Sequence, residues 1–324
     1  MAASDSTGAD LKLKECYDLN KQRDFALIKK AKALIPLAKA YPKSDFSVRV
    51  YTLVGRGFAN ARIFDSCQQY FDLGFRNLSP SVSADAEAHL NLSSAFFLLV
   101  NQSYVKAEAC CQRAYDLYKK IDKKQGMSWA RGVMADILTD QKKYKESIAF
   151  SEESGLLALS IGDTITYIYS IVTQGNTLAR MGDNKSAVSK FSKAVPFLIK
   201  KGIDAEVALT YTNISSCYLD MLENNKSIDA SRKALFYARK ANIDYFNGAN
   251  YLNLASAYLE LGKLSKAVLY ADTASNLLKN SLDLEMGASK YKLLAGIYNK
   301  AKLYDKALKC LISYDSLNTI RFSN

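Results

Sequence analysis

Three asparagines in the second half of the chain, Asn176, Asn213 and Asn253, carry the side chains with the clearest binding chemistry. A side-chain amide both donates and accepts hydrogen bonds, so a row of amides can hold the main chain of an extended peptide without reading its sequence. Asparagine on an exposed helix face can also serve only to keep that face soluble. The choice between these interpretations depends on the elements that position the three residues.

Residues suited to catalysis are scarce. The single histidine, His89, cannot build a His-rich metal site or a pair of acid–base histidines. The six cysteines show no CxxC or metal-ligand spacing. The adjacent Cys110 and Cys111 would point about 100° apart on a helix, so we expect small buried hydrophobes rather than disulfides. With no recognisable nucleophile, the sequence predicts neither an enzyme nor a metal or cofactor site.

Composition favours a helical protein without a membrane span. Only 15 Gly and 4 Pro punctuate 324 residues, too few turn formers for a sheet-rich fold. The longest apolar run, AFFLLV at 95–100, is far shorter than the roughly 20 residues of a spanning helix. The net charge is +12, yet the lysines are spread along the chain without one basic block or aromatic interleaving. We therefore interpret them as solvated faces and expect no nucleic-acid partner.

A small residue recurs every 40 residues, at Gly55, Ala95, Ala135, Gly175, Ser215, Ala255 and Ala295. Three residues later stands a larger apolar residue, and twelve later a second small one: Cys67, Ala107, Ser147, Ala187, Ser227, Ala267 and Ala307. Nineteen residues later a third small residue follows in every copy except the last, which has Tyr314. Such a period indicates stacked helix pairs, whose closest crossings need small side chains.

Each unit is expected to contain two helices. The first begins at a recurring aspartate that can cap it, at Asp122, Asp163, Asp204, Asp244 or Asp283, and runs about 17 residues. A turn such as 181–184 or 261–263 leads into the second helix. Pro36 and Pro196 fall late in second helices, where we expect each to kink the final turns.

The segment NLASAYLELGKLSKAVLYADTA at 253–274 resembles the tetratricopeptide repeat. The resemblance covers residues 11–318, with a degenerate first repeat at 11–41 and seven clear repeats at 48–318. Residues 1–10 are then a disordered tail, and 319–324 a tail or the start of a connector. The 40-residue period exceeds the family's usual 34, as in kinesin light chains, the LGN family and bacterial peptide-sensing regulators. Pentatricopeptide arrays, which bind RNA, keep close to 35.

The resemblance implies an all-α, right-handed superhelical solenoid of about eight helix-turn-helix repeats, whose first helices line a concave groove. Carried onto this sequence, the groove positions lie six and two residues before each first small residue, and one and four or five after it. The expected groove residues are Asn176, Asn213, Asn253, Tyr169, Arg180, Ser216, Asp220, Ser256, Glu260 and Trp129, together with Arg49, Arg56, Asn60, Asp136, Asp140 and Thr173. For Trp129 and Tyr169 we favour packing between repeats over peptide anchoring.

These features predict a non-catalytic module that binds a peptide or protein segment in its groove. Lys292 occupies one position of the carboxylate clamp of chaperone-binding relatives, but the partner positions do not follow. The stretch YDSL at 314–317 resembles the junction in bacterial sensor proteins between an exported repeat array and a following membrane span. We therefore expect the sensory region of a bacterial signalling protein, periplasmic rather than cytoplasmic. A free-standing scaffold for a multiprotein complex is the alternative.

Overall fold

The computed structural model describes residues 3–21, 26–61, 63–244, 247–278 and 284–323. Seventeen α-helices account for nearly all of this part of the chain, which contains no β-strand. The all-α prediction is therefore confirmed for the described residues.

Three helices form the N-terminal segment: α1 (Ala3–Lys21), α2 (Ala26–Lys32) and α3 (Ile35–Ala40). The first helices of the seven repeats are α4 (Asp45–Asn60), α6 (Ala84–Val100), α8 (Lys124–Asp140), α10 (Thr164–Met181), α12 (Asp204–Asp220), α14 (Asn247–Glu260) and α16 (Leu284–Lys300). The second helices are α5 (Phe64–Arg76), α7 (Tyr104–Lys120), α9 (Tyr144–Ser160), α11 (Asn184–Lys200), α13 (Asn224–Lys240), α15 (Leu264–Leu278) and α17 (Tyr304–Ser323).

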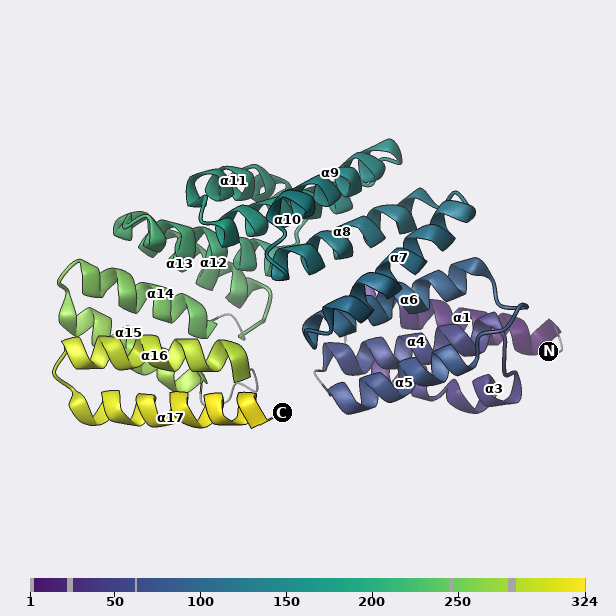
Figure 1. Cartoon of the computed structure of the whole chain (residues 1–324), viewed down its shortest axis with the longest axis horizontal. Coiled ribbons are helices and arrows are strands. Elements are labelled where there is room, and N and C mark those ends of the chain that lie inside the picture. Colours follow the sequence, from purple (N-terminus) through teal and green to yellow (C-terminus); the bar gives the residue numbers. More distant parts are fainter. Residues whose placement is uncertain (1–2, 22–25, 62, 245–246, 279–283, 324) are drawn as a thin grey trace. The chain divides into compact units, whose positions relative to one another are not determined.

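The structure divides into two compact units, Met1–Thr173 and Gln174–Asn324, with the boundary inside α10. Within each unit the two helices of a repeat pack as a hairpin, as α6 with α7 and α16 with α17 do (Figure 1). Successive first helices also contact one another. In the first unit α4 contacts α6 and α6 contacts α8, and in the second unit α12 contacts α14 and α14 contacts α16. Each unit therefore presents a surface made of neighbouring first helices.

The turns between helices follow one pattern. A residue with positive φ recurs every 20 residues at Gln102, Asp122, Lys142, Gly162, Gly182, Gly202, Leu222, Asn242 and Gly262, and again at Lys302; position 282 lies outside the described residues. At the turn that contains Gly262, the Gly262 N–H donates to the Leu259 carbonyl at 2.9 Å. The Lys263 N–H donates to the Tyr258 carbonyl, also at 2.9 Å. This is a Schellman motif, which satisfies the last carbonyls of a helix and ends it.

The predicted helix starts are confirmed in part. Asp163 does cap α10: its carboxylate accepts from the Thr166 N–H over 3.1 Å and from the Thr166 hydroxyl over 2.7 Å. Asp122 does not cap α8, because it is the left-handed residue of the preceding turn and the helix begins at Lys124. Asp204 is the first residue inside α12, and Asp283 lies outside the described residues.

Every first and second small position lies in the core. Gly55, Gly175 and the other members of both series are buried. A Cβ added at Gly175 would lie 2.6 Å from Cε1 of Phe191, and one at Gly55 would lie 2.9 Å from Cε1 of Phe71. The buried Ser215 bonds instead to the hydroxyl of Ser227 over 2.8 Å. The small residues therefore do mark the closest helix contacts.

The N-terminal segment differs from the sequence expectation. Helix α1 begins at Ala3, inside the residues 1–10 for which we expected a disordered tail, and it buries Ala9, Leu13 and Cys16 along one face. Pro36 stands at the start of the short α3 and not late in a helix, because its missing N–H and fixed φ suit the first turn. Pro196 does lie inside α11, as predicted.

The cysteines are free and form no disulfide in the described part of the chain. Five are buried, as expected of small hydrophobes, and Cys110 is only half-buried. Burial raises the pKa of the Cys67 and Cys111 thiols to about 12, which leaves them protonated and unreactive at neutral pH.

Candidate functional site

Neighbouring first helices are joined by polar pairs at one recurring register. The residue directly after a small position faces the residue two before the next small position, 37 residues on. Four such inter-repeat pairs form hydrogen bonds: Arg56 with Ser93 at 3.4 Å, Asp136 with Thr173 at 3.3 Å, Asn176 with Asn213 at 2.9 Å and Ser216 with Asn253 at 3.1 Å. Two of the groove positions inferred from the resemblance therefore lie against each other within each unit.

In the second unit these pairs contain the three predicted asparagines. Asn213 donates from Nδ2 to Oδ1 of Asn176, and Asn253 donates from Nδ2 to Ser216 Oγ and, at 3.3 Å, to Ser215 Oγ. All three asparagines are half-buried. An amide has two N–H donors and an oxygen with two lone pairs, so these bonds use only part of the capacity of Asn176 and Asn213.

The next pair in the series is not bonded, and a pocket of about 440 Å³ lies there between α14 and α16. The unbonded pair consists of Ser256 and Leu293, which occupy the same two repeat positions as Ser216 and Asn253. The Ser256 hydroxyl is buried and makes no hydrogen bond among the described residues. The remaining lining residues are Leu259, Glu260, Lys292, Gly296, Ile297 and Lys300.

The pocket is apolar inside and charged at its edge. Leu259, Leu293 and Ile297 supply the apolar lining. Glu260 and Lys300 form an ion pair at 3.3 Å, and both are exposed. Exposed ion pairs contribute little to stability, so these two side chains can exchange partners at small cost. The arrangement suits one apolar side chain with a polar main chain beside it.

The other predicted residues of the second unit lie on the same helices. Arg180, Asp220 and Glu260 are exposed, each five residues after its small position. The carboxylate of Asp220 accepts from Asn184 Nδ2 at 3.4 Å. Ser216 is exposed and bonded to Asn253. The structure therefore places Asn176, Asn213, Asn253, Ser216, Ser256 and Glu260 on successive first helices of one unit, and we call these six residues the first-helix row.

The two predicted aromatic residues belong to the first unit. Trp129 on α8 donates from Nε1 to the Thr166 hydroxyl on α10 at 3.3 Å. Its side chain is 38% exposed and that of Tyr169 is 37% exposed. The bond from Trp129 to the next first helix is consistent with packing between repeats.

In a polar cluster of the first unit, sequence reasoning placed Arg49 in the groove but missed its polar partners Tyr17 and Asp85 and the neighbouring His89. Arg49 donates to the Tyr17 hydroxyl at 3.2 Å and forms an ion pair with Asp85 at 2.7 Å. Tyr17 packs edge-on against His89, with ring centroids 5.5 Å apart. Burial, followed by the nearby Arg56, lowers the pKa of His89 to about 3, so the ring is neutral at physiological pH. His89 lies six residues before Ala95, so the same offset rule could have found it.

The cluster also clarifies the degenerate first repeat. Arg56 on α4 donates from Nε to Asn20 Oδ1 on α1 at 3.2 Å, across 36 residues of sequence. This spacing is close to that of the other inter-repeat pairs. Helix α1 therefore takes the place of a first helix before α4.

Some kinds of site are not found in the described residues. His, Cys, Asp and Glu side chains in this part of the chain form no group of three that could hold a metal ion. None of the described helices combines the length and the apolarity that a bilayer crossing requires.

No family model and no curated protein sequence matches the chain. Solved structures of similar fold include a Rap protein complexed with Competence and Sporulation Factor, at TM-score 0.65 and 11% identity over 97% of this chain and 98% of that one. Aspartyl phosphate phosphatase F from Bacillus subtilis has TM-score 0.65 and 13% identity over 89% and 75% of the two chains. NprR in complex with its cognate peptide NprX has TM-score 0.62 and 14% identity over 90% and 84%.

These likenesses and the 40-residue helix pairs define the class of fold. The chain has a tetratricopeptide-like helical repeat fold.

Proposed function

We propose that the first-helix row of the second unit binds an extended peptide segment. The observation that carries the proposal is the pocket between α14 and α16, which opens where the series of hydrogen-bonded pairs is interrupted. The unpartnered hydroxyl of Ser256 lies in this pocket beside apolar side chains. An apolar side chain of the peptide would enter the pocket while its main chain bonds to the amides.

The chemistry of the row suits main-chain recognition. Amides and hydroxyls at a regular spacing can donate to peptide carbonyls and accept from peptide N–H groups. The carboxylate of Glu260 and the ammonium groups of Lys292 and Lys300 flank the pocket and can favour charged residues at its edge. Sequence preference would therefore come mainly from the pocket, and general affinity from the amides.

We propose a non-catalytic role. The row consists of amides, hydroxyls and one carboxylate, and the histidine lies in the other unit with its pKa lowered to about 3. A nucleophile beside a base, which acyl or phosphoryl transfer to a side chain would need, is absent from the row. Among the structurally similar proteins, one is aspartyl phosphate phosphatase F and another is NprR, which was solved in complex with its cognate peptide NprX.

The binding proposal can be tested by blocking the pocket. Random 12-residue peptides displayed on phage would be selected on the full chain, and the tightest would be synthesised. We expect Ser256→Trp to weaken the binding of this synthesised peptide at least tenfold, because the indole side chain fills the pocket. Ser160→Trp, at an exposed position on α9, is the matched control and should bind as the parent does. A peptide that binds the Ser256→Trp variant as tightly as the parent contradicts the proposal.

For the biological role we propose the sensory region of a bacterial signalling protein on the periplasmic side, with a free-standing scaffold as the alternative. An antibody against this chain would report the mass and membrane partitioning of the endogenous protein. A membrane-bound species well above 35.9 kDa supports the sensor role. A species near 35.9 kDa that does not partition into membranes favours the scaffold.

A further inference from the structure

Two second helices of the second unit hold most of the net positive charge of the chain. Helices α11 and α13 together carry nine cationic side chains: Lys185, Lys190, Lys193, Lys200, Lys226, Arg232, Lys233, Arg239 and Lys240. Against them stands one carboxylate, that of Asp229. Since the whole chain has a net charge of +12, this pair of helices is its most strongly basic part.

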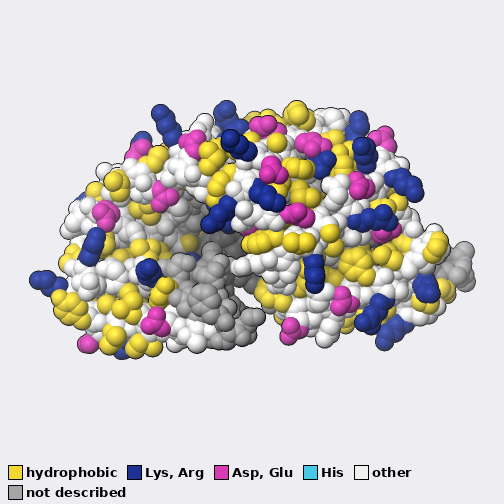
Figure 2. Space-filling model, viewed as in Figure 1, with side chains coloured by type: hydrophobic (Ala, Val, Ile, Leu, Met, Phe, Trp, Pro, Cys, Tyr) yellow, Lys and Arg dark blue, Asp and Glu magenta, His cyan; other side chains and the backbone are white. Residues whose placement is uncertain are grey.

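Part of this charge is unpaired. Within the described residues, Lys240 pairs with Asp204 at 3.0 Å and Lys226 pairs with Glu223. Lys193, Lys200, Lys233 and Arg239 are exposed and form no ion pair with any described carboxylate. On the face shown in Figure 2, lysine and arginine side chains are interspersed with acidic ones, so the excess of cations on α11 and α13 follows from their sequences. An excess of unpaired cations favours an anionic partner.

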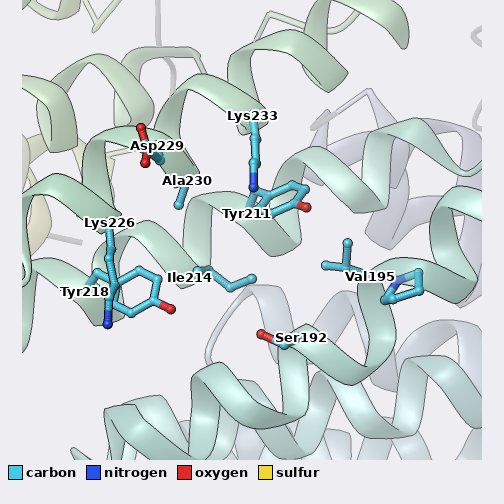
Figure 3. Close-up of a pocket in the computed structure, with 10 residues that line it drawn as sticks. Ser192, Val195, Tyr211, Ile214, Tyr218, Lys226, Asp229, Ala230 and Lys233 are labelled. Carbon is cyan, nitrogen blue, oxygen red and sulfur yellow. The ribbon is translucent and has the colours of Figure 1, made fainter.

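A pocket of about 380 Å³ lies between these two helices, with α12 beside them. Figure 3 shows its side chains around an open space: Tyr211, Ile214 and Tyr218 from α12, Ser192, Val195 and Pro196 from α11, and Lys226, Asp229, Ala230 and Lys233 from α13. Each lysine lies over a ring, Lys226 over Tyr218 at 5.4 Å and Lys233 over Tyr211 at 5.5 Å. The pocket therefore has an aromatic and aliphatic lining with cations above it.

The α12 residues that line the pocket follow a helical row of two turns, from Tyr211 to Tyr218, roughly 10 Å long. On α11, Pro196 has no N–H, so the carbonyl of Ser192 loses its usual intrahelical partner beside the pocket. The pocket therefore has an apolar wall beside a helical turn that lacks one backbone hydrogen bond. These are the features of a groove that accepts a short amphipathic segment.

We infer that the α11–α13 groove is a second protein-binding surface, which takes an acidic amphipathic segment of a partner protein. Its apolar side chains enter the pocket against Val195, Ile214 and Tyr211. Its carboxylates bind the unpaired cations on α11 and α13, among them Lys193 and Lys233. This surface lies on second helices, so it is distinct from the peptide site on the first-helix row and does not depend on it.

A protein segment fits the groove better than a nucleic acid or an anionic bilayer. A phosphate backbone needs cations along its whole length, and here Asp229 lies among the lining residues. A bilayer binds flat surfaces with a projecting apolar row, whereas the apolar side chains here line a depression between two helices. The combination of a recessed apolar pocket and a cationic rim is typical of sites for acidic amphipathic peptides.

The test uses the full chain and three fluorescein-labelled probes. The first is a synthetic 16-residue peptide with leucine at a helical spacing and glutamate elsewhere. The second has glutamine in place of every glutamate, and the third has serine in place of every leucine. Fluorescence anisotropy at 0.1 M salt should show the first peptide binding at least tenfold more tightly than either of the others. Equal binding of all three would overturn the inference.

Two variants locate the binding. Lys226→Glu combined with Lys233→Glu reverses the charge at the groove, and Ser192→Trp fills the pocket from an exposed position. Each should weaken the acidic peptide at least tenfold. Lys106→Glu combined with Lys119→Glu, at exposed positions on α7, is the matched control and should leave its binding unchanged. Binding that falls as much in the control, or in neither groove variant, contradicts the inference.

Competition distinguishes the partner classes and the two sites. Oligouridylate RNA and vesicles of phosphatidylglycerol should fail to displace the acidic peptide at the same salt concentration. Displacement by either at concentrations similar to that of the peptide would assign the groove to that class instead. Ser256→Trp should leave the acidic peptide bound, because its pocket lies between α14 and α16. If Ser256→Trp abolishes this binding, the probe occupies the first-helix row and the second surface is refuted.

Discussion

Asn213 on α12 donates a hydrogen bond from its amide nitrogen to the amide oxygen of Asn176, 37 residues earlier on α10, at 2.9 Å. The bond joins neighbouring first helices, and it also fixes the direction in which each amide presents its remaining groups. The same two side chains therefore contribute to packing between repeats and to the first-helix row for which we propose peptide binding. If the first-helix row binds peptide as we propose, stability and binding are coupled at these positions.

A double-mutant cycle measures the interaction energy between these two side chains. Asn213→Ala removes the donor and Asn176→Ala the acceptor, and each should lower the free energy of unfolding by about 1 kcal/mol, the usual net value of one hydrogen bond. The double variant should lose clearly less than the sum of the two, because both changes break the same bond. Urea unfolding followed by circular dichroism gives the three values. Strict additivity would show that the bond does not form in solution.

Ala267 tests the assignment of close helix crossings. It is fully buried at the second small position of its repeat, so Ala267→Leu should overpack the crossing and cost roughly 1–3 kcal/mol of stability. Ala109→Leu, on the exposed face of α7, is the matched control and should change stability by under about 0.5 kcal/mol. Thermal unfolding of both variants provides the comparison. Equal stability of Ala267→Leu and the parent would mean that this position is not a close crossing.

At the left-handed turn positions, introducing glycine and removing glycine should change the free energy of unfolding in opposite directions. Leu222 has φ of 59° and is 74% exposed, so its β-carbon is strained without any packing in return. Leu222→Gly should therefore raise the free energy of unfolding by about 1 kcal/mol. Gly262, at the equivalent turn with φ of 70°, should lose about 1 kcal/mol when changed to alanine. If both changes shift stability in the same direction, the turn assignment is incorrect.

Asp163 predicts a dependence on pH. Burial of its carboxyl opposes ionisation, but hydrogen bonds from the side chain and backbone of Thr166 outweigh this and lower its pKa. A lowered pKa stabilises the folded state above the ordinary aspartate pKa of about 4, and this contribution is lost as the pH falls through the folded value. Asp163→Ala should therefore cost about 1 kcal/mol at pH 7 and progressively less below pH of about 4.

The control for this prediction is Asp315→Ala, at an exposed position on α17. Its stability should follow that of the parent at every pH tested by urea unfolding. A constant difference between Asp163→Ala and the parent from pH 7 to pH 3 would show that the cap does not act through the ionised carboxylate.

Much of the fold could be predicted from the sequence because the constraint repeats. Close helix crossings exclude large side chains, so residues such as Ala255 and Ala267 mark the period directly. Turns are less visible, since a left-handed residue need not be glycine. Asp122 occupies such a turn position, and its carboxylate resembled a helix cap in the sequence. The Schellman hydrogen bonds that fix it there involve only backbone atoms and leave little trace in the side chains.

The candidate site was predictable only as positions, not as contacts. The offset rule placed Asn176 and Asn213 on first helices, but their hydrogen bond depends on how two repeats pack. The pocket at Ser256 likewise depends on Leu293, which no binding motif would single out. The basic character of α11 and α13 was hidden because the lysines are spaced at helical intervals, and only folding brings the two helices to either side of one pocket.

The most direct measurement of the central claim is photo-cross-linking with the peptide selected on the full chain. A benzophenone group would replace one apolar residue of that peptide, and mass spectrometry would identify the cross-linked sites. We expect cross-links on α14 and α16 around Ser256 and Leu293, which Ser256→Trp abolishes. Cross-links confined to the second helices α11, α13 and α15 would contradict the claim that the first-helix row binds peptide.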